Sequence, residues 1–187
     1  MQDLLYIHGF LSSPESGKAR LTQDWARQRP GLRLQMPALP VDPAAALAIL
    51  EDCVRRSTTP PGVIGSSLGG FYANILAARH GLRAALINPA VHPHRLLADY
   101  VGEQRNLHTG VAAKVKPEHF RLLESLEQTP PHPERLWVLL ETGDQTLDYR
   151  LAEQFYADCA VDVTVGGSHA YESFAARLPA IMDFLSR

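Results

Sequence analysis

The sequence predicts an α/β protein with one parallel β-sheet that helices cover on both faces. Three observations predict this class: short apolar runs alternate with longer helical patterns, the runs are mostly continuous in hydrophobicity, and a glycine-rich turn joins one run to the next helix. Continuously apolar strands are typical of parallel sheets, because both faces of each strand are buried. At 187 residues we expect a single domain, 1–187, whose core needs no disulfide or metal.

The apolar runs are expected to form six parallel strands. With right-handed crossovers, their expected order in the sheet, numbered along the chain, is 2-1-3-4-5-6. The runs are 4–7, 33–36, 63–65, 84–88, 136–141 and 161–165.

Helical patterns fill most of the segments between these runs. Residues 43–56 begin with a proline after Asp42, which is suited to cap a helix. Residues 68–80 are rich in alanine and end at Gly81, a typical C-terminal cap. The remaining expected helices are 17–28, 149–157 and 171–185.

One segment, 89–133, interrupts the alternation. It shows no predicted strand and only two short helical patterns, 94–100 and 117–126. Its length of about 45 residues exceeds what one crossover between parallel strands requires. We therefore predict a small helical cap inserted at 89–133, with a plain crossover as the alternative.

Composition and charge exclude several classes of function. The formal net charge is -2 and no Lys/Arg run occurs, so a nucleic-acid partner is not expected. No apolar run approaches the roughly 20 residues that span a bilayer. The first residues lack the basic start of a signal peptide, and the two isolated cysteines, Cys53 and Cys159, suit a reducing compartment. These features predict a cytoplasmic protein without a membrane span.

The chain offers little that would hold a metal or an anion. His92 and His94 are closely spaced but have no partnering cluster of acids or thiols, so no metal and no cofactor are expected. Five basic side chains of the predicted cap could meet an anionic group, but a solvated face explains them better. They are Arg95, Arg105, Lys114, Lys116 and Arg121.

The glycine-rich turn, Gly-Ser-Ser-Leu-Gly at 65–69, lies between a predicted strand and a predicted helix. A sharp strand–turn–helix of this pattern holds a serine in a strained conformation that exposes its hydroxyl, and small flanking residues allow the two backbones to approach. The pattern predicts Ser67 as a nucleophile, whereas Ser66 is expected to pack. A structural glycine turn is the alternative interpretation.

An acid and a histidine follow later strands in the order that a serine hydrolase requires. Asp144 comes after the run 136–141, and His169 comes after the run 161–165, so both fall at carboxyl ends of strands. Asp144 would orient His169, which would accept the proton of Ser67. Asp148 is the rival acid, better explained as a helix cap, and Glu141 is a more distant one.

Two backbone N–H groups are expected to complete the site. The first predicted strand ends in His8-Gly9-Phe10, and a turn after this strand commonly supplies one donor to the oxyanion. The predicted oxyanion donors are therefore the N–H groups of Phe10 and Leu68. His8 is expected to stabilise the loop.

Motifs spread over nearly the whole chain resemble one family. They are 8–14 with Ser16 and Lys18, 65–71, 88–91 with Pro93, 142–144 with 147–150, and 166–169. In this order they resemble the YqiA-like esterase family of the α/β-hydrolase superfamily. The resemblance implies hydrolysis of carboxylic esters without a cofactor, with acyl-CoA thioesters as a further substrate class.

The predicted function is a serine hydrolase that cleaves small or medium acyl esters through an acyl-enzyme. Its expected partner is therefore a small-molecule ester or thioester. Two alternatives stay open from the sequence. One is a catalytically silent domain used for binding, and the other is a hydrolase of a peptide or C–C bond. The physiological substrate and the oligomeric state are not set by these patterns.

Overall fold

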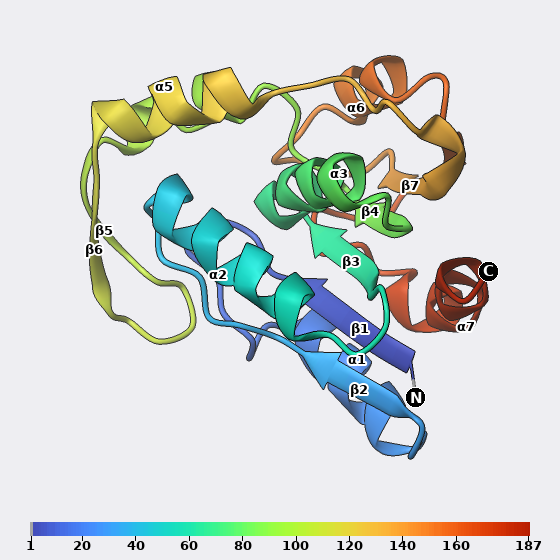
Figure 1. Ribbon diagram of the computed structural model, residues 1–187. Helices are drawn as coiled ribbons and strands as arrows, with labels where there is room; N and C mark the ends of the chain where they lie inside the picture. Colours follow the sequence, from blue (N-terminus) through green and yellow to red (C-terminus); the bar gives the residue numbers. More distant parts are fainter. Residues whose placement is uncertain (1) are drawn as a thin grey trace.

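A six-stranded, wholly parallel sheet forms the centre of the computed structural model, which describes residues 2–187 (Figure 1). The strand order is β2-β1-β3-β4-β7-β8. Because β5 and β6 form a separate pair, this is the predicted order of the six apolar runs. The strands are β1 Gln2–Ile7, β2 Leu32–Gln35, β3 Gly62–Ser66, β4 Ala84–Ile87, β7 Leu136–Glu141 and β8 Ala160–Thr164.

Helices pack on both faces of this sheet, as predicted. One face is covered by α1 (Gly17–Arg27) and α7 (Phe174–Leu185), and the other by α2 (Pro43–Arg56), α3 (Leu68–His80) and α6 (Tyr149–Phe155) (Figure 1). The side chain of Asp42 caps α2 by accepting from two backbone N–H groups, and Gly81 ends α3 with a φ of +63°. Both caps were predicted from the sequence.

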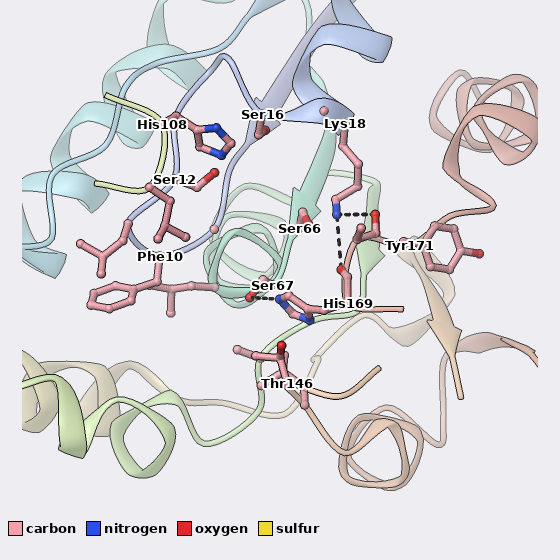
Figure 2. Close-up of a pocket in the computed structure, with 18 of the residues that line it drawn as sticks. Phe10, Ser12, Ser16, Lys18, Ser66, Ser67, His108, Thr146, His169 and Tyr171 are labelled. Atoms are coloured by element: carbon pink, nitrogen blue, oxygen red, sulfur yellow. Dashed lines mark hydrogen bonds between the residues drawn. The ribbon is translucent and has the colours of Figure 1, made fainter. Parts of the chain in front are cut away.

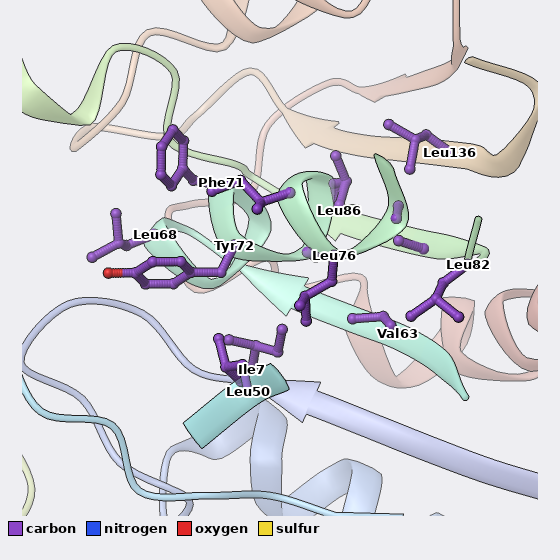
Figure 3. Close-up of a cluster of buried hydrophobic side chains, with 14 of the residues drawn as sticks. Ile7, Leu50, Val63, Leu68, Phe71, Tyr72, Leu76, Leu82, Leu86 and Leu136 are labelled. Carbon is purple, nitrogen blue, oxygen red and sulfur yellow. The ribbon is translucent and has the colours of Figure 1, made fainter. Parts of the chain in front are cut away.

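The central strands are largely apolar because their side chains point alternately into two separate cores. Leu5 and Val63 belong to the core beneath α2 and α3, whereas Leu4 and Ile64 belong to the core beneath α1 and α7. Figure 3 shows the first core, with residues of α3 packed against strand residues. Every residue of α3 from Leu68 to Ala77 is buried, which explains why this helix is apolar on nearly all sides.

The segment that joins β4 to β7, residues 88–135, is named the cap segment here. It contains α4 (Pro93–Leu96), a 3₁₀ turn (Ala98–Tyr100) and α5 (Pro117–Leu126), and Figure 1 shows it extending across one end of the sheet. The helix over 117–126 is confirmed. The helical pattern over 94–100 is broken in two after Leu96.

The prediction that this segment contains no strand is wrong. β5 (Gly102–Arg105) and β6 (Ala112–Val115) form an antiparallel hairpin. Asn106 stabilises the turn by accepting N–H groups of residues 108 and 109 on its side chain, and Gly110 has a φ of +69°. The hairpin escaped detection because its strands are four residues long and mostly exposed, so they carry no apolar alternation.

Two further observations concern the rest of the described chain. Cys53 and Cys159 are both free thiols. Over residues 2–187, the helices are all too short or too polar to cross a bilayer.

Candidate active site

Ser67 occupies the sharp turn between β3 and α3. Its φ is +56° and its ψ is -122°, a conformation that non-glycine residues rarely adopt. The neighbouring backbone holds it there: Ser67 N–H donates to Ile87 O at 3.0 Å, and Ser67 O accepts from the N–H groups of Gly70 and Ala90 at 2.9 and 3.0 Å. Strain of this kind persists only where the surrounding structure enforces it, and it concentrates at functional sites.

The glycines of the turn are required by close backbone contacts, as the sequence predicted. A methyl group added at Gly65 would overlap the carbonyl oxygen of Gly69, and one added at Gly69 would overlap the carbonyl oxygen of Ile7. The helix therefore lies directly against the ends of β1 and β3. This packing points the Ser67 side chain away from the sheet and into the cleft.

The structure brings Ser67, His169 and Asp144 together in one hydrogen-bonded chain. His169 Nε2 lies 3.2 Å from Ser67 Oγ (Figure 2), and His169 Nδ1 lies 2.7 Å from Asp144 Oδ2. The other carboxylate oxygen of Asp144 accepts N–H groups of Thr146 and Leu147, each at 2.8 Å. The side chain of Asp144 is fully buried, and that of His169 is 26% exposed.

These contacts set the protonation pattern of the chain. Burial alone would raise the pKa of Asp144, but the hydrogen bonds from the His169 ring and from the N–H groups of Leu147 and Thr146 outweigh it and lower that pKa. An ionised Asp144 keeps the proton of the neutral imidazole on Nδ1. Nε2 is then an acceptor, and it faces the Ser67 hydroxyl.

Neither rival acid contacts the His169 ring. Asp148 caps α6, where its side chain accepts the N–H of Arg150 at 3.0 Å, and that side chain is 50% exposed. Glu141 is fully buried and binds backbone groups of the loop that carries His169. Of the three acids, the structure places only Asp144 against the imidazole.

The contacts of Glu141 are the part of the site that sequence reasoning missed. Its carboxylate accepts the N–H groups of Ser168, Glu172 and Ser173, each at 2.9 Å, and the Ser173 hydroxyl at 2.7 Å. Tyr171 has a φ of +56°, outside the helical region, so α7 begins at Phe174 rather than at the predicted residue 171. An acidic residue at the end of a strand that is otherwise apolar is the signal that could have indicated this role.

We expect Glu141→Gln to lower the free energy of unfolding by about 2 kcal/mol, because an amide cannot accept four donors. Burial opposes ionisation of Glu141, yet its hydrogen bonds, led by that from Ser173, hold its pKa below the ordinary value. The stability from a depressed pKa is present above the unfolded value of about 4.3 and is lost as the pH falls through the folded value. The difference in the free energy of unfolding between the wild type and Glu141→Gln should therefore be largest near neutral pH and become smaller in acid.

Urea denaturation at several pH values measures this effect. Glu153→Gln is a matched control, because Glu153 is exposed on α6. A Glu141 variant as stable as the Glu153 variant at neutral pH would contradict the prediction.

The two predicted oxyanion donors lie beside Ser67. Leu68 is the first residue of α3, and neither its N–H nor that of Phe10 donates a hydrogen bond within residues 2–187. Gly9 brings the loop after β1 close to the serine, since a methyl group at Gly9 would be 3.2 Å from Ser67 Cβ. Within residues 2–187, both N–H groups are therefore without a hydrogen-bond partner.

His8 has the structural role that the sequence suggested. Its Nε2 accepts the N–H of Leu39 at 3.0 Å, so Nδ1 carries the proton and donates to Gly9 O at 2.9 Å. Burial lowers the pKa of His8, which favours this neutral form. His8 therefore ties the loop after β1 to the segment after β2.

A cavity of about 760 Å³ opens at Ser67, between the strand ends and the cap segment. Its volume lies within the range of small-molecule sites, about 300–1,000 Å³. Large apolar side chains form much of the wall, and the rings of Phe10 and Tyr100 meet edge to face with centroids 5.5 Å apart. Other apolar residues of the wall are Leu11, Leu68, Leu96, Leu97 and Leu107. Such a cavity suits a ligand that is apolar over much of its surface.

Metal-binding side chains do not cluster at this cavity within the described residues. Over 2–187, no three His, Cys, Asp or Glu side chains are placed to hold a metal ion. His92 instead pairs with Glu127, at 2.6 Å, and so joins α4 to the end of α5. The five basic side chains predicted to lie in the cap, from Arg95 to Arg121, do not line the cavity.

The fold and the serine turn together define a protein of the α/β-hydrolase fold. The chain belongs to a family described as an uncharacterised protein family, UPF0227, whose model matches residues 3–186. The YqiA-like resemblance drawn from the sequence is thereby confirmed.

Solved structures from several organisms share this fold. Est1E from Butyrivibrio proteoclasticus has a TM-score of 0.72 at 16% identity, covering 99% of this chain and 87% of that one. Mouse alpha/beta hydrolase domain-containing protein 10 has a TM-score of 0.72 at 15% identity, with 98% and 88% covered. A pyrethroid hydrolase from Sphingobium faniae JZ-2 has a TM-score of 0.65 at 18% identity, with 99% and 97% covered.

Proposed function

We propose that the protein is a serine hydrolase that cleaves carboxylic esters of small or medium acyl groups. The observation that carries the proposal is the hydrogen-bonded chain from Ser67 through His169 to Asp144, at 3.2 and 2.7 Å. A serine hydroxyl becomes a useful nucleophile when a base of this kind is held against it and a buried carboxylate orients the base.

In the proposed reaction, Ser67 Oγ attacks the ester carbonyl carbon while His169 Nε2 accepts its proton. The carbonyl oxygen becomes an oxyanion, which the N–H groups of Phe10 and Leu68 stabilise at the positive end of α3. His169 then donates the proton to the departing alkoxide, which leaves as the alcohol, and the acyl group remains on Ser67. A water molecule, deprotonated by His169, attacks the acyl carbonyl carbon, and the bond from this carbon to Ser67 Oγ breaks. His169 returns the proton to Ser67 Oγ as the acid leaves.

The names of the structural neighbours support an ester substrate. They include a pyrethroid hydrolase and an esterase from Pyrococcus furiosus, although at identities of 18% and 14%. The apolar wall of the cavity supports an apolar group on the substrate. Acyl-CoA thioesters are a further candidate class, since the same attack on a thioester carbonyl releases a thiol.

We expect the purified protein to react with a fluorophosphonate probe and to hydrolyse p-nitrophenyl butyrate. The probe modifies only an activated serine, so a catalytically silent binding domain would stay unlabelled. A series of p-nitrophenyl esters and acyl-CoA thioesters of increasing chain length would then define the substrate. Short and medium acyl groups should react faster than long ones, because a single cavity of about 760 Å³ must hold both the acyl group and the alcohol group of the ester. Labelling without hydrolysis of any ester would favour a peptide or C–C substrate.

A further inference from the structure

Lys18 lies at the start of α1 and is 151 residues away from His169 in the chain, yet its ammonium group contacts the loop that carries His169. Nζ donates to the carbonyl oxygen of Ala170 at 2.7 Å and lies 3.5 Å from that of His169. Figure 2 shows both contacts at the wall of the cavity. The other lysines of the chain, Lys114 and Lys116, are exposed in the cap segment.

Side chains bind this loop through both kinds of backbone group. Glu141 accepts N–H groups, as described above, whereas Lys18 and Asn88 donate to carbonyl oxygens. Asn88 Nδ2 lies 3.1 Å from Ser168 O and 3.5 Å from His169 O, and Asn88 Oδ1 accepts the N–H of Glu141 at 3.0 Å. The loop is neither helix nor strand, so these side chains hold the backbone on either side of His169 in place.

The placement of the Lys18 ammonium is unusual for a lysine. Lysine side chains commonly extend their charge into water, because a buried charge is costly unless it is paired or hydrogen-bonded. Burial lowers the pKa of Lys18 to about 8, and the charges of Asp144 and Glu141 act in the opposite direction. The Lys18 side chain is half-buried with its ammonium against two backbone carbonyls, and packing alone does not require a charge there.

We propose that Lys18 is a positioning residue, whose hydrogen bonds to the loop at His169 and Ala170 keep the imidazole aligned with Ser67 Oγ. The inference rests on the proposed function, since it assigns His169 as the base. On this inference, the alignment of His169 depends on a residue of α1, a helix near the opposite end of the chain.

Lys18→Met tests the proposal, because methionine retains most of the apolar stem and removes every donor. Rates are expressed per active site, titrated by the burst of p-nitrophenol, so that misfolded protein does not count. We expect kcat for p-nitrophenyl butyrate to fall by about 10- to 100-fold, as small misplacements of a catalytic group do, with KM changed less than about 2-fold. Labelling by a fluorophosphonate should slow by a similar factor. Lys114→Met, the same change at an exposed lysine, should alter neither rate.

Two results would overturn the proposal. An unchanged kcat per active site would mean that the Lys18 bonds do not align the base. A raised KM with unchanged kcat would assign Lys18 to substrate binding instead.

Amide hydrogen exchange separates this proposal from the proposed function. Exchange at residues 168–173 should accelerate in Lys18→Met and not in Lys114→Met, whatever reaction the protein catalyses. If the wild-type protein is active but exchange in Lys18→Met is unchanged, the role of Lys18 is contradicted and the proposed function is not. A wild-type protein that reacts with neither probe nor ester would contradict the proposed function, while the exchange result would still report on the loop.

Discussion

Ser67→Ala should lower kcat for p-nitrophenyl butyrate by roughly 10³-fold or more, because the acyl-enzyme cannot form without the hydroxyl. The oxyanion donors and the cavity remain intact in this variant, so some binding and a small residual rate are expected. Fluorophosphonate labelling should disappear. Alanine retains the Cβ and removes only the hydroxyl, so the fold at this strained turn should persist.

Ser66→Ala is the matched control. Ser66 is the adjacent serine, it is buried at the end of β3, and its hydroxyl makes no hydrogen bond within residues 2–187. The control should therefore retain most of the activity. If Ser67→Ala retained its activity and its labelling while Ser66→Ala lost them, the assignment of the nucleophile would be wrong.

Asp144→Asn should lower kcat by about 10³- to 10⁴-fold with little change in KM. The amide can donate to His169 Nδ1 and so favours the tautomer whose Nε2 carries the proton and cannot accept from Ser67. In the wild type, the N–H groups of Thr146 and Leu147 bind one carboxylate oxygen of Asp144. The side-chain oxygen of an asparagine can still accept both. The overall structure is expected to change little.

Asp148→Asn gives a direct comparison, because asparagine caps a helix as well as aspartate does. Its kcat should stay within about 2-fold of wild type, since capping of α6 is preserved. Steady-state kinetics of the two variants at one pH suffices. A larger loss at Asp148 than at Asp144 would identify Asp148 as the acid.

The local features of the site could be predicted from the sequence because each depends on a short pattern. The glycine positions around Ser67 follow from backbone contacts within one strand–turn–helix unit. Asp144 and His169 could be placed together because parallel strands end at the same edge of the sheet. The caps at Asp42 and Gly81 likewise depend only on neighbouring residues.

The roles of Glu141 and Lys18 were not predicted, because they arise from contacts between distant segments. Lys18 meets the His169 loop only once α1 has packed on the sheet beside α7, and nothing in residues 16–20 indicates an ammonium that binds this loop. Glu141 resembled a candidate acid, since the sequence shows an acidic residue after a strand but not which way its carboxylate points. The hairpin of the cap segment was missed for a different reason, namely that its strands are short and mostly exposed.

The burial of α3 from Leu68 to Ala77 has a consequence for how the protein loses its function under stress. Amides of a helix enclosed on all sides exchange only when the whole domain opens, so Ser67 belongs to the most cooperative unit of the fold. His169 lies in a loop fixed by side chains, and such a loop can open by local unfolding at a lower free energy. Ser67 and His169, which a 3.2 Å hydrogen bond joins, are therefore expected to belong to cooperative units of different stability. Under mild denaturation, the loop that carries His169 should therefore open, and His169 should separate from Ser67, before the sheet unfolds.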